Sequence, residues 1–264
     1  MKQVLINDIQ MAYDDVGSGM PIILVHGYPF NRTLWNEQVI ALRETHRIIT
    51  PDLRGFGDSD TSEGPSTMDR MAQDVAHLMD ALGITKAVLG GLSMGGYVVL
   101  AFYKHFSSRV EALLLADTRP QGDTEEGKKT RAQQVEQILA EGMAGVTDAM
   151  LPKLLTPETV SKRPEVVRRI RDMMLKTKPA GAAAALQGMA AREDQTQLLT
   201  CITVPTLILV GREDPITPVV DSETMHSKIA QSRMTILDDA SHVSNIEKAD
   251  VFNAELFPFL GSIA

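Results

Sequence analysis

Residues 87–102 read AVLGGLSMGGYVVLAF, and this stretch decides how the rest of the chain is interpreted. A short apolar run leads into Gly91-Leu92-Ser93-Met94-Gly95, and a run compatible with a helix follows. A G-x-S-x-G motif between a strand and a helix predicts a sharp turn that presents the serine, called a nucleophile elbow. Such a turn strains the serine backbone, so glycines are needed two residues to either side. The alternative is an ordinary glycine-rich turn that contains a serine.

Strands and helices alternate on both sides of this motif. Continuous apolar runs predict buried strands, and apolar residues at a 3.6-residue spacing predict helices. Such a pattern favours an α/β fold with a mostly parallel sheet and helices on both faces. A capping box, Ser66-x-x-Asp69, is expected to start one helix. Strands are expected at 3–6, 10–13, 22–25, 47–50, 86–90, 110–116, 206–210 and 234–237, and helices at 33–42, 66–82, 94–105, 219–229 and 249–260.

Residues 119–197 interrupt the alternation, because they contain no strand-like run and no Phe, Trp or Tyr. Apolar stripes within 135–143, 146–154 and 166–174 predict three helices, and Pro179 is expected to open a fourth. We predict that 119–197 is an inserted helical cap, or lid, and that 1–118 and 198–264 together form the core domain. The alternative is a set of ordinary helices that cover the sheet.

Composition narrows the class of protein. The 264 residues carry a net charge of −8 with no basic stripe, which argues against nucleic acid as a partner. The N-terminal residues lack an apolar stretch long enough for a signal peptide, and no uninterrupted run suits a membrane span. We therefore expect a cytoplasmic protein without a membrane partner. Cys201 is the single cysteine and is expected in the core, and no Cys/His spacing suits a metal, so neither cofactor nor metal is expected.

A serine nucleophile needs a histidine base and a carboxylate that orients the histidine. His242 is the only histidine on a loop after a predicted late strand, and Asp214 follows the strand before it. Ser93, Asp214 and His242 therefore project from the same edge of the sheet. Asp117, after the strand that follows the elbow helix, is a rival acid. His26 is an alternative catalytic residue, although its place before Gly27 suits a role in shaping the loop.

Acyl transfer also needs hydrogen-bond donors for the oxyanion that develops on the substrate. The backbone N–H of Met94 is one candidate, because it follows the nucleophile at the start of a helix. The other is expected from the loop after Val25, where we choose Tyr28. Pro29 has no N–H and cannot donate.

These residues lie in motifs that resemble the α/β-hydrolase family in the expected order. The motifs are HGYP at 26, DLRGFGDS at 52, GGLSMGG at 90, GREDPITP at 211 and DDASHVSNIE at 238. The resemblance implies an eight-stranded sheet with a lid, Ser93 as nucleophile, Asp214 as acid, His242 as base, and Tyr28 and Met94 as oxyanion donors. The chain looks most like small carboxylesterases and 3-oxoadipate enol-lactonases. Haloalkane dehalogenases and epoxide hydrolases carry aspartate in place of Ser93, which argues against both of those chemistries.

The expected function is hydrolysis of small carboxylic esters without a cofactor, through an acyl-enzyme. Lactone hydrolysis of the enol-lactonase type is the nearest alternative, and perhydrolysis or cleavage of a carbon–carbon bond beside a carbonyl also fit the site. A ligand receptor that keeps the fold without turnover is an alternative of another class. Uncharged acyl groups of modest size are expected to suit the pocket. Its expected walls are Phe30 and Tyr97 below, and Met143, Met150, Met173 and Met174 in the cap.

Overall fold

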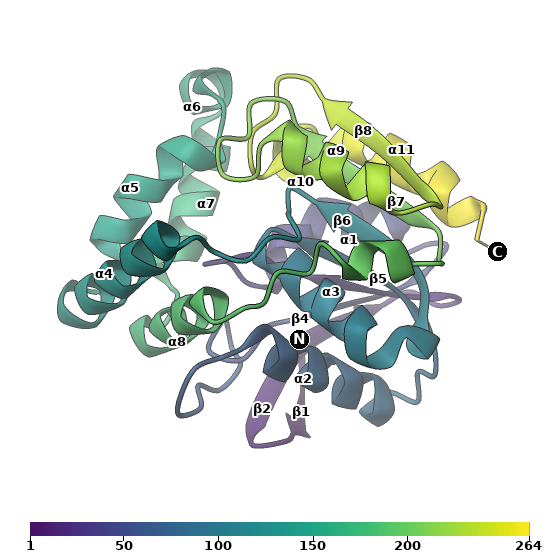
Figure 1. Ribbon diagram of the computed structural model, residues 1–264, viewed down its shortest axis with the longest axis horizontal. Coiled ribbons are helices and arrows are strands. Elements are labelled where there is room, and N and C mark those ends of the chain that lie inside the picture. Colours follow the sequence, from purple (N-terminus) through teal and green to yellow (C-terminus); the bar gives the residue numbers. More distant parts are fainter. Residues whose placement is uncertain (264) are drawn as a thin grey trace.

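The computed structural model describes residues 1–263, which form one mixed sheet of eight strands (Figure 1). The strand order is β1-β2-β4-β3-β5-β6-β7-β8. Strand β2 runs antiparallel to both of its neighbours, and the other neighbouring strands are parallel. The predicted mostly parallel α/β sheet is confirmed. The strands are β1 (Lys2–Ile6), β2 (Ile9–Val16), β3 (Pro21–Val25), β4 (Arg47–Pro51), β5 (Ala87–Leu92), β6 (Val110–Ala116), β7 (Thr206–Gly211) and β8 (Ser232–Leu237).

Helices cover both faces of the sheet, because successive residues of a buried strand point to opposite sides. In β3, Ile23 and Val25 belong to one hydrophobic cluster, while Ile22 and Leu24 belong to the other. The first cluster includes residues of α2 (Met68–Ala81), α3 (Met94–Phe106) and α9 (Val219–Lys228). The second includes residues of η1 (Arg32–Trp35), α1 (Asn36–Leu42), α10 (Ser244–Glu247) and α11 (Ala249–Gly261).

Five further helices lie between β6 and β7 and gather at one side of the sheet (Figure 1). One of them, α6, was not expected from the sequence. It is short, and it starts where the Thr156 side chain caps the N–H of Thr159 and a proline occupies the first turn. The division into core and cap stays a prediction. The helices are α4 (Glu125–Glu141), α5 (Ala144–Leu154), α6 (Pro157–Lys162), α7 (Pro164–Leu175) and α8 (Pro179–Ala190).

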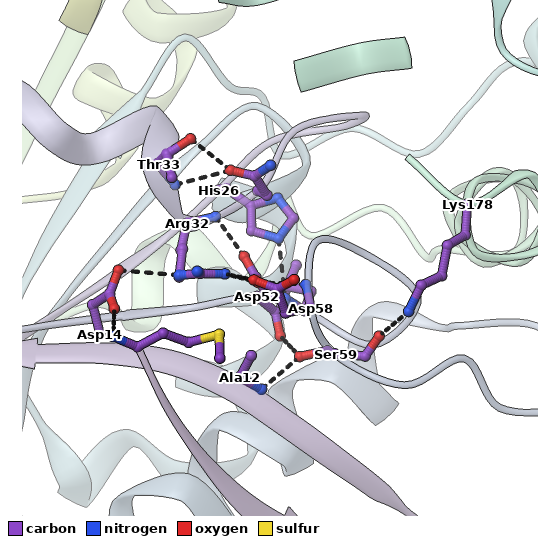
Figure 2. Close-up of polar contacts among 12 residues, drawn as sticks. Ala12, Asp14, His26, Arg32, Thr33, Asp52, Asp58, Ser59 and Lys178 are labelled. Atoms are coloured by element: carbon purple, nitrogen blue, oxygen red, sulfur yellow. Dashed lines mark hydrogen bonds and ion pairs between the residues drawn. The ribbon is translucent and has the colours of Figure 1, made fainter. Parts of the chain in front are cut away.

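These five helices are fastened to the rest of the chain by polar contacts. The Thr177 hydroxyl donates to the carbonyl of Pro29 over 2.8 Å. Figure 2 shows Lys178, at the start of α8, donating to the Ser59 carbonyl over 2.7 Å. In α8, Gly181 lies so close to the 52–59 loop that an added Cβ would stand 2.0 Å from the Gly55 carbonyl oxygen. The backbone of the 52–59 loop therefore packs directly against the backbone of α8.

Three local expectations are wrong. The N-cap of α2 is Thr67, whose hydroxyl accepts from the Arg70 N–H, so the cap lies one residue after Ser66 and the expected Ser66-x-x-Asp69 capping box does not form. Ser66 is instead buried, and its N–H donates to the Ala184 carbonyl of α8. Leu139, expected in an apolar stripe, is 60% exposed on α4. Cys201 is exposed rather than part of the core, because it ends the 3-10 turn η3 (Leu198–Cys201), in which Leu199 supplies the buried side chain.

None of the helices within residues 1–263 has the length and apolar character needed to cross a membrane.

Candidate active site

Ser93 sits in a strained turn between β5 and α3. Its backbone has φ 54° and ψ −118°, a conformation that costs a non-glycine residue roughly 1–3 kcal/mol. The flanking glycines are required by space, since an added Cβ at Gly91 would lie 2.3 Å from the Gly95 carbonyl oxygen. At Gly95 it would lie 2.2 Å from the Val25 carbonyl oxygen. The turn is held by the Thr118 hydroxyl, which donates to the Ser93 carbonyl over 2.8 Å.

A continuous chain of hydrogen bonds joins Ser93, His242 and Asp214, although 149 residues separate the serine from the histidine. Ser93 Oγ lies 2.8 Å from His242 Nε2, and His242 Nδ1 lies 2.8 Å from Asp214 Oδ2. All three residues are buried, and Ser93 is only 8% exposed. The structure thus brings together the three side chains that the sequence placed on separate loops.

Asp214 is held as an acceptor for the histidine. Its carboxylate also accepts the Thr217 hydroxyl over 2.6 Å and the N–H groups of Ile216 and Thr217 over 2.8 and 3.1 Å. Burial alone raises the pKa of Asp214, but the His242 charge and these hydrogen bonds together hold the pKa below its ordinary value. An ionised Asp214 keeps a proton on His242 Nδ1 and leaves Nε2 free to accept the proton of Ser93.

The carboxylate of Asp117, the alternative acid, accepts hydrogen bonds from groups other than His242. Its carboxylate accepts the Gly211 N–H over 2.8 Å and the Ser244 hydroxyl, and no hydrogen bond within residues 1–263 joins it to His242. Complete burial and the nearby charge of Asp214 raise the pKa of Asp117 well above its ordinary value. Of the two candidate acids, it is therefore Asp214 that contacts the histidine.

Tyr28 and Met94, the two candidate oxyanion donors, both have an unpaired backbone N–H in the described part of the chain. Neither N–H makes a hydrogen bond to another group in residues 1–263. Gly27 lets the loop after β3 approach Ser93, because a Cβ added to Gly27 would lie 3.2 Å from Ser93 Cβ. Strands β3 and β5 are neighbours in the sheet, so the loop after β3 and the start of α3 meet at the same edge.

His26 uses both ring nitrogens to hold this loop. Nδ1 lies 2.9 Å from the Gly27 carbonyl oxygen, and Nε2 accepts the Leu53 N–H over 3.0 Å. Burial lowers the pKa of His26 despite the opposing charge of Asp52, so the ring is neutral with its proton on Nδ1. The Gly27 carbonyl and the Tyr28 N–H belong to one planar peptide, so fixing the carbonyl turns the N–H to the opposite side.

Asp52 holds the end of the loop after β3 through its contacts with Arg32, as Figure 2 shows. The buried carboxylate accepts the backbone N–H groups of Arg32 over 2.7 Å and of Asp58 over 2.9 Å, and it pairs with the Arg32 guanidinium. Ser59 donates to the Asp52 carbonyl over 2.7 Å and accepts the Ala12 N–H over 2.9 Å. The hydrogen bonds of the DLRGFGDS motif, residues 52–59, therefore fix the segment whose Leu53 N–H donates to His26.

The residues expected in the pocket walls fall into two groups. Tyr97 and Met143 share a cluster with Tyr28 and Met94. Phe30 shares the other cluster with Met173 and Met174 of α7. Met150 is partly buried and packs against both clusters. The binding role of each of these residues stays a prediction.

Charged residues near the site carry no sequence motif and were not anticipated. Arg119, Arg131 and Arg192 surround the carboxylate of Asp123, which is 2% exposed. The signal that could have marked them is the position of Arg119, three residues beyond a strand that ends at the same edge as the elbow strand. Within residues 1–263, no group of three or more His, Cys, Asp or Glu side chains is arranged to hold a metal ion.

Comparison with known proteins agrees with this architecture. The model of the α/β hydrolase fold matches residues 20–249, and the chain belongs to this family. It is 32% identical to 3-oxoadipate enol-lactonase 1 of Acinetobacter baylyi over 87% of this chain and 84% of the relative. Among solved structures, a thermophilic esterase from Thermogutta terrifontis, studied with malate bound, is 40% identical with a TM-score of 0.98. That match covers 100% of this chain and 99% of the esterase.

An enol-lactonase from Burkholderia xenovorans LB400 is 31% identical with a TM-score of 0.93, over 98% of this chain and 100% of that one. Proteins described as esterases and as enol-lactonases are thus both similar to this chain. The family and these relatives identify it as a hydrolase.

Proposed function

We propose that the protein is a serine hydrolase that cleaves small carboxylic esters through an acyl-enzyme, with Ser93, His242 and Asp214 as its catalytic triad. The observation that carries the proposal is the buried hydrogen-bond chain from Ser93 Oγ through the imidazole to Asp214. A strained serine beside two unpaired backbone N–H groups is the arrangement that acyl transfer requires.

In the first half-reaction, His242 Nε2 takes the proton of Ser93 as Oγ attacks the ester carbonyl carbon. The N–H groups of Tyr28 and Met94 then donate to the oxyanion, and each such donor can supply about 3 kcal/mol of transition-state stabilisation. The protonated His242 next gives its proton to the leaving alcohol, and the acyl group stays on Ser93. Asp214 stabilises the imidazolium without taking its proton.

In the second half-reaction, His242 takes a proton from water, and the hydroxide attacks the acyl-enzyme. The acid product leaves when Ser93 recovers its proton. Helices α4–α8 are proposed to act as a cap over this site, so that residues 119–197 form a lid and residues 1–118 and 198–264 the catalytic core. The near-complete burial of Ser93 supports this division, because bulk water is kept from the acyl-enzyme.

Lactone hydrolysis is the second candidate, since relatives described as enol-lactonases cover most of the chain. Its chemistry uses the same residues, but the leaving alcohol stays tethered to the acyl-enzyme. A panel of p-nitrophenyl esters beside a panel of lactones, compared by kcat/KM, separates the two candidates.

The first prediction tests Ser93 itself. Ser93→Ala should lower ester hydrolysis by about three or more orders of magnitude and leave the melting temperature within a few degrees, because the triad acts as one unit. Ser108→Ala, at an exposed serine after α3, is the matched control and should keep full activity. An alkyl phosphonate should label the parent and the control but not Ser93→Ala, as mass spectrometry of the intact proteins would report.

A variant that keeps more than a few per cent of the parent activity would contradict the assignment of the nucleophile. Labelling of Ser93 without turnover of any ester or lactone would instead favour the ligand-receptor alternative.

A further inference from the structure

The side chain of Thr118, two residues beyond the end of β6, reaches back to the turn that carries Ser93. Its hydroxyl donates to the Ser93 carbonyl oxygen over 2.8 Å, and the residue is fully buried. The Ser93 carbonyl and the Met94 N–H belong to the same planar peptide, so a group that fixes the carbonyl also fixes the direction of the N–H. That N–H is one of the two proposed oxyanion donors.

The helix that starts at this peptide holds it only in part. Ser93 has φ 54° and ψ −118°, which lie outside the helical range. Its carbonyl accepts the Gly96 N–H over 2.9 Å and the Tyr97 N–H over 3.3 Å, while the Met94 N–H has no partner within residues 1–263. A peptide inside a helix is held at both its carbonyl and its N–H. Of the hydrogen bonds that the Ser93 carbonyl accepts in the described chain, the one from Thr118 is the shortest.

Gly96 leaves room for Thr118. The G-x-S-x-G turn requires Gly91 and Gly95, and it does not explain a further glycine at position 96. A Cβ added to Gly96 would lie 2.3 Å from Thr118 Oγ1. Glycine inside a helix lowers stability relative to alanine. The helix therefore has its least favourable ordinary residue at the point where the threonine side chain enters.

Asp117 fixes the backbone from which Thr118 projects. Its φ of 43° lies in the left-handed region, which aspartate and asparagine adopt more readily than most residues. The Asp117 N–H donates to the Leu209 carbonyl of β7 over 2.9 Å. On the other side, the Ser93 N–H donates to the Ala116 carbonyl over 3.0 Å. The end of β6 is thus tied to both neighbouring segments, and the Thr118 hydroxyl acts from a fixed support.

We propose that Thr118 is a positioning residue for the oxyanion hole, because its hydroxyl aims the Met94 N–H at the oxyanion that forms on Ser93. The same hydrogen bond polarises the peptide and makes its N–H a stronger donor. The other proposed donor has a similar support, since His26 contacts the carbonyl of the peptide that carries the Tyr28 N–H. This inference rests on the proposed function, because the Met94 N–H has a catalytic task only if Ser93 attacks a carbonyl.

The test uses Thr118→Val, which removes the hydroxyl and keeps the branched shape, with p-nitrophenyl butyrate as substrate. The kcat/KM per active site, counted by titration with an alkyl phosphonate, should fall roughly 10-fold, less than the loss of about 10²–10³-fold expected when an oxyanion donor is removed. The inhibition constant of a trifluoromethyl ketone, which forms an oxyanion on Ser93, should rise by a similar factor. The acidic midpoint of the pH profile should not move, because His242 keeps its contacts with Ser93 and Asp214.

Thr206→Val is the matched control. Thr206 is also fully buried, and its hydroxyl donates to the Val204 carbonyl over 3.1 Å, but it lies at the start of β7, at the edge of the sheet opposite to Ser93. This variant should keep the parent kcat/KM and ketone inhibition even if its melting temperature falls. Thr118→Ser restores a hydroxyl and should recover most of the lost kcat/KM. Thr118→Ala, a second variant without the hydroxyl, should show the same loss if the valine prevents folding.

Failure of the inference and failure of the proposed function give different results. An unchanged kcat/KM per titrated site in the variants without the hydroxyl, an unchanged ketone inhibition constant, or a loss that Thr118→Ser does not recover would overturn the positioning role alone. The parent still hydrolyses the ester in each of these cases. A parent that hydrolyses no ester or lactone, with Ser93 unreactive toward a phosphonate, would reject the proposed function and the inference together.

Discussion

At the scale of single residues, the two buried aspartates Asp214 and Asp117 have different surroundings. Asp214 accepts hydrogen bonds from Thr217 and Ile216 and faces His242, and these groups hold its pKa below the ordinary value. Asp117 faces neutral donors and the Asp214 charge in a fully buried place, and its pKa is raised. The first environment favours a carboxylate, and the second favours a carboxylic acid.

The second prediction follows from this contrast. Asp214→Asn should lower kcat by about three to four orders of magnitude, because the amide favours the wrong tautomer of His242. Asp117→Asn should keep most of the activity, since an amide can still accept the Gly211 N–H. Initial rates with one ester, measured for both variants and the parent, decide between the two acids. Greater damage from Asp117→Asn would mean that Asp214 is the wrong choice.

The third prediction concerns the pH dependence of stability. A carboxyl group whose pKa is raised by folding costs stability as the pH climbs from its unfolded pKa, about 3.9, toward its folded pKa. Removing that group should therefore stabilise the protein more at neutral pH than in acid. The difference in melting temperature between Asp117→Asn and the parent should become more favourable to the variant from pH 4 to pH 8. A difference that stays constant over this range would show that Asp117 does not carry a raised pKa.

At the scale of elements, Glu247 joins the inserted helices to the loop that carries His242. One carboxylate oxygen of this buried residue accepts the Thr156 N–H over 2.8 Å, where α5 gives way to α6. The other oxygen accepts the Ser241 N–H over 2.7 Å, and Ser241 immediately precedes His242. Leu154, at the end of α5, also accepts the Val243 N–H over 3.2 Å. The position of the histidine thus depends on the helices after β6 as well as on β8.

The fourth prediction tests this link. Glu247→Gln should lower the free energy of unfolding by about 1–3 kcal/mol, because the amide nitrogen cannot accept a buried N–H. It should also lower kcat more than it raises KM, since the His242 loop loses its fixed position. Glu223→Gln, at an exposed residue of α9, is the control and should change neither value. Denaturant titration and steady-state kinetics provide the two readouts. Loss of stability without any change in kcat would limit Glu247 to a structural role.

At the scale of the whole molecule, the site forms where the strands end together. Ser93 follows β5, the Tyr28 loop follows β3, and Asp214 and His242 follow β7 and β8, all at the carboxyl edge of parallel strands. Helices α4–α8 occupy the interval between β6 and β7, and the hydrophobic clusters on the two faces of the sheet include Met143, Met173 and Met174. We propose that the sheet and the inserted helices together enclose Ser93, which is 8% exposed.

The fifth prediction tests whether this enclosure sets chain-length selectivity. Among neutral esters, kcat/KM should peak at acyl chains of roughly two to six carbons, with each useful methylene contributing at most about 0.8 kcal/mol. Changing Met143, Met150, Met173 or Met174 singly to Ala should shift the optimum toward longer chains. Leu139→Ala, at an exposed residue of α4, should leave the profile unchanged. A parent optimum at ten carbons or beyond, or an unchanged profile in all four methionine variants, would contradict this role for the helices.

The sequence by itself determined the features that depend on local chemistry. The turn at Ser93 needs glycines at fixed positions, and buried parallel strands need continuous apolar runs, so the alternation and the elbow could be read from neighbouring residues. His242 and Asp214 could be paired with the serine because parallel strands end at one edge. The family resemblance then narrowed the chemistry.

Only the tertiary structure decided the features that depend on residues distant in the chain. Arg119, Arg131 and Arg192 look like ordinary charged residues in the sequence, and folding alone gathers them around Asp123. The same holds for Glu247, whose partners lie on separate segments. Burial and charge balance arise from packing between distant segments, so no local pattern encodes them.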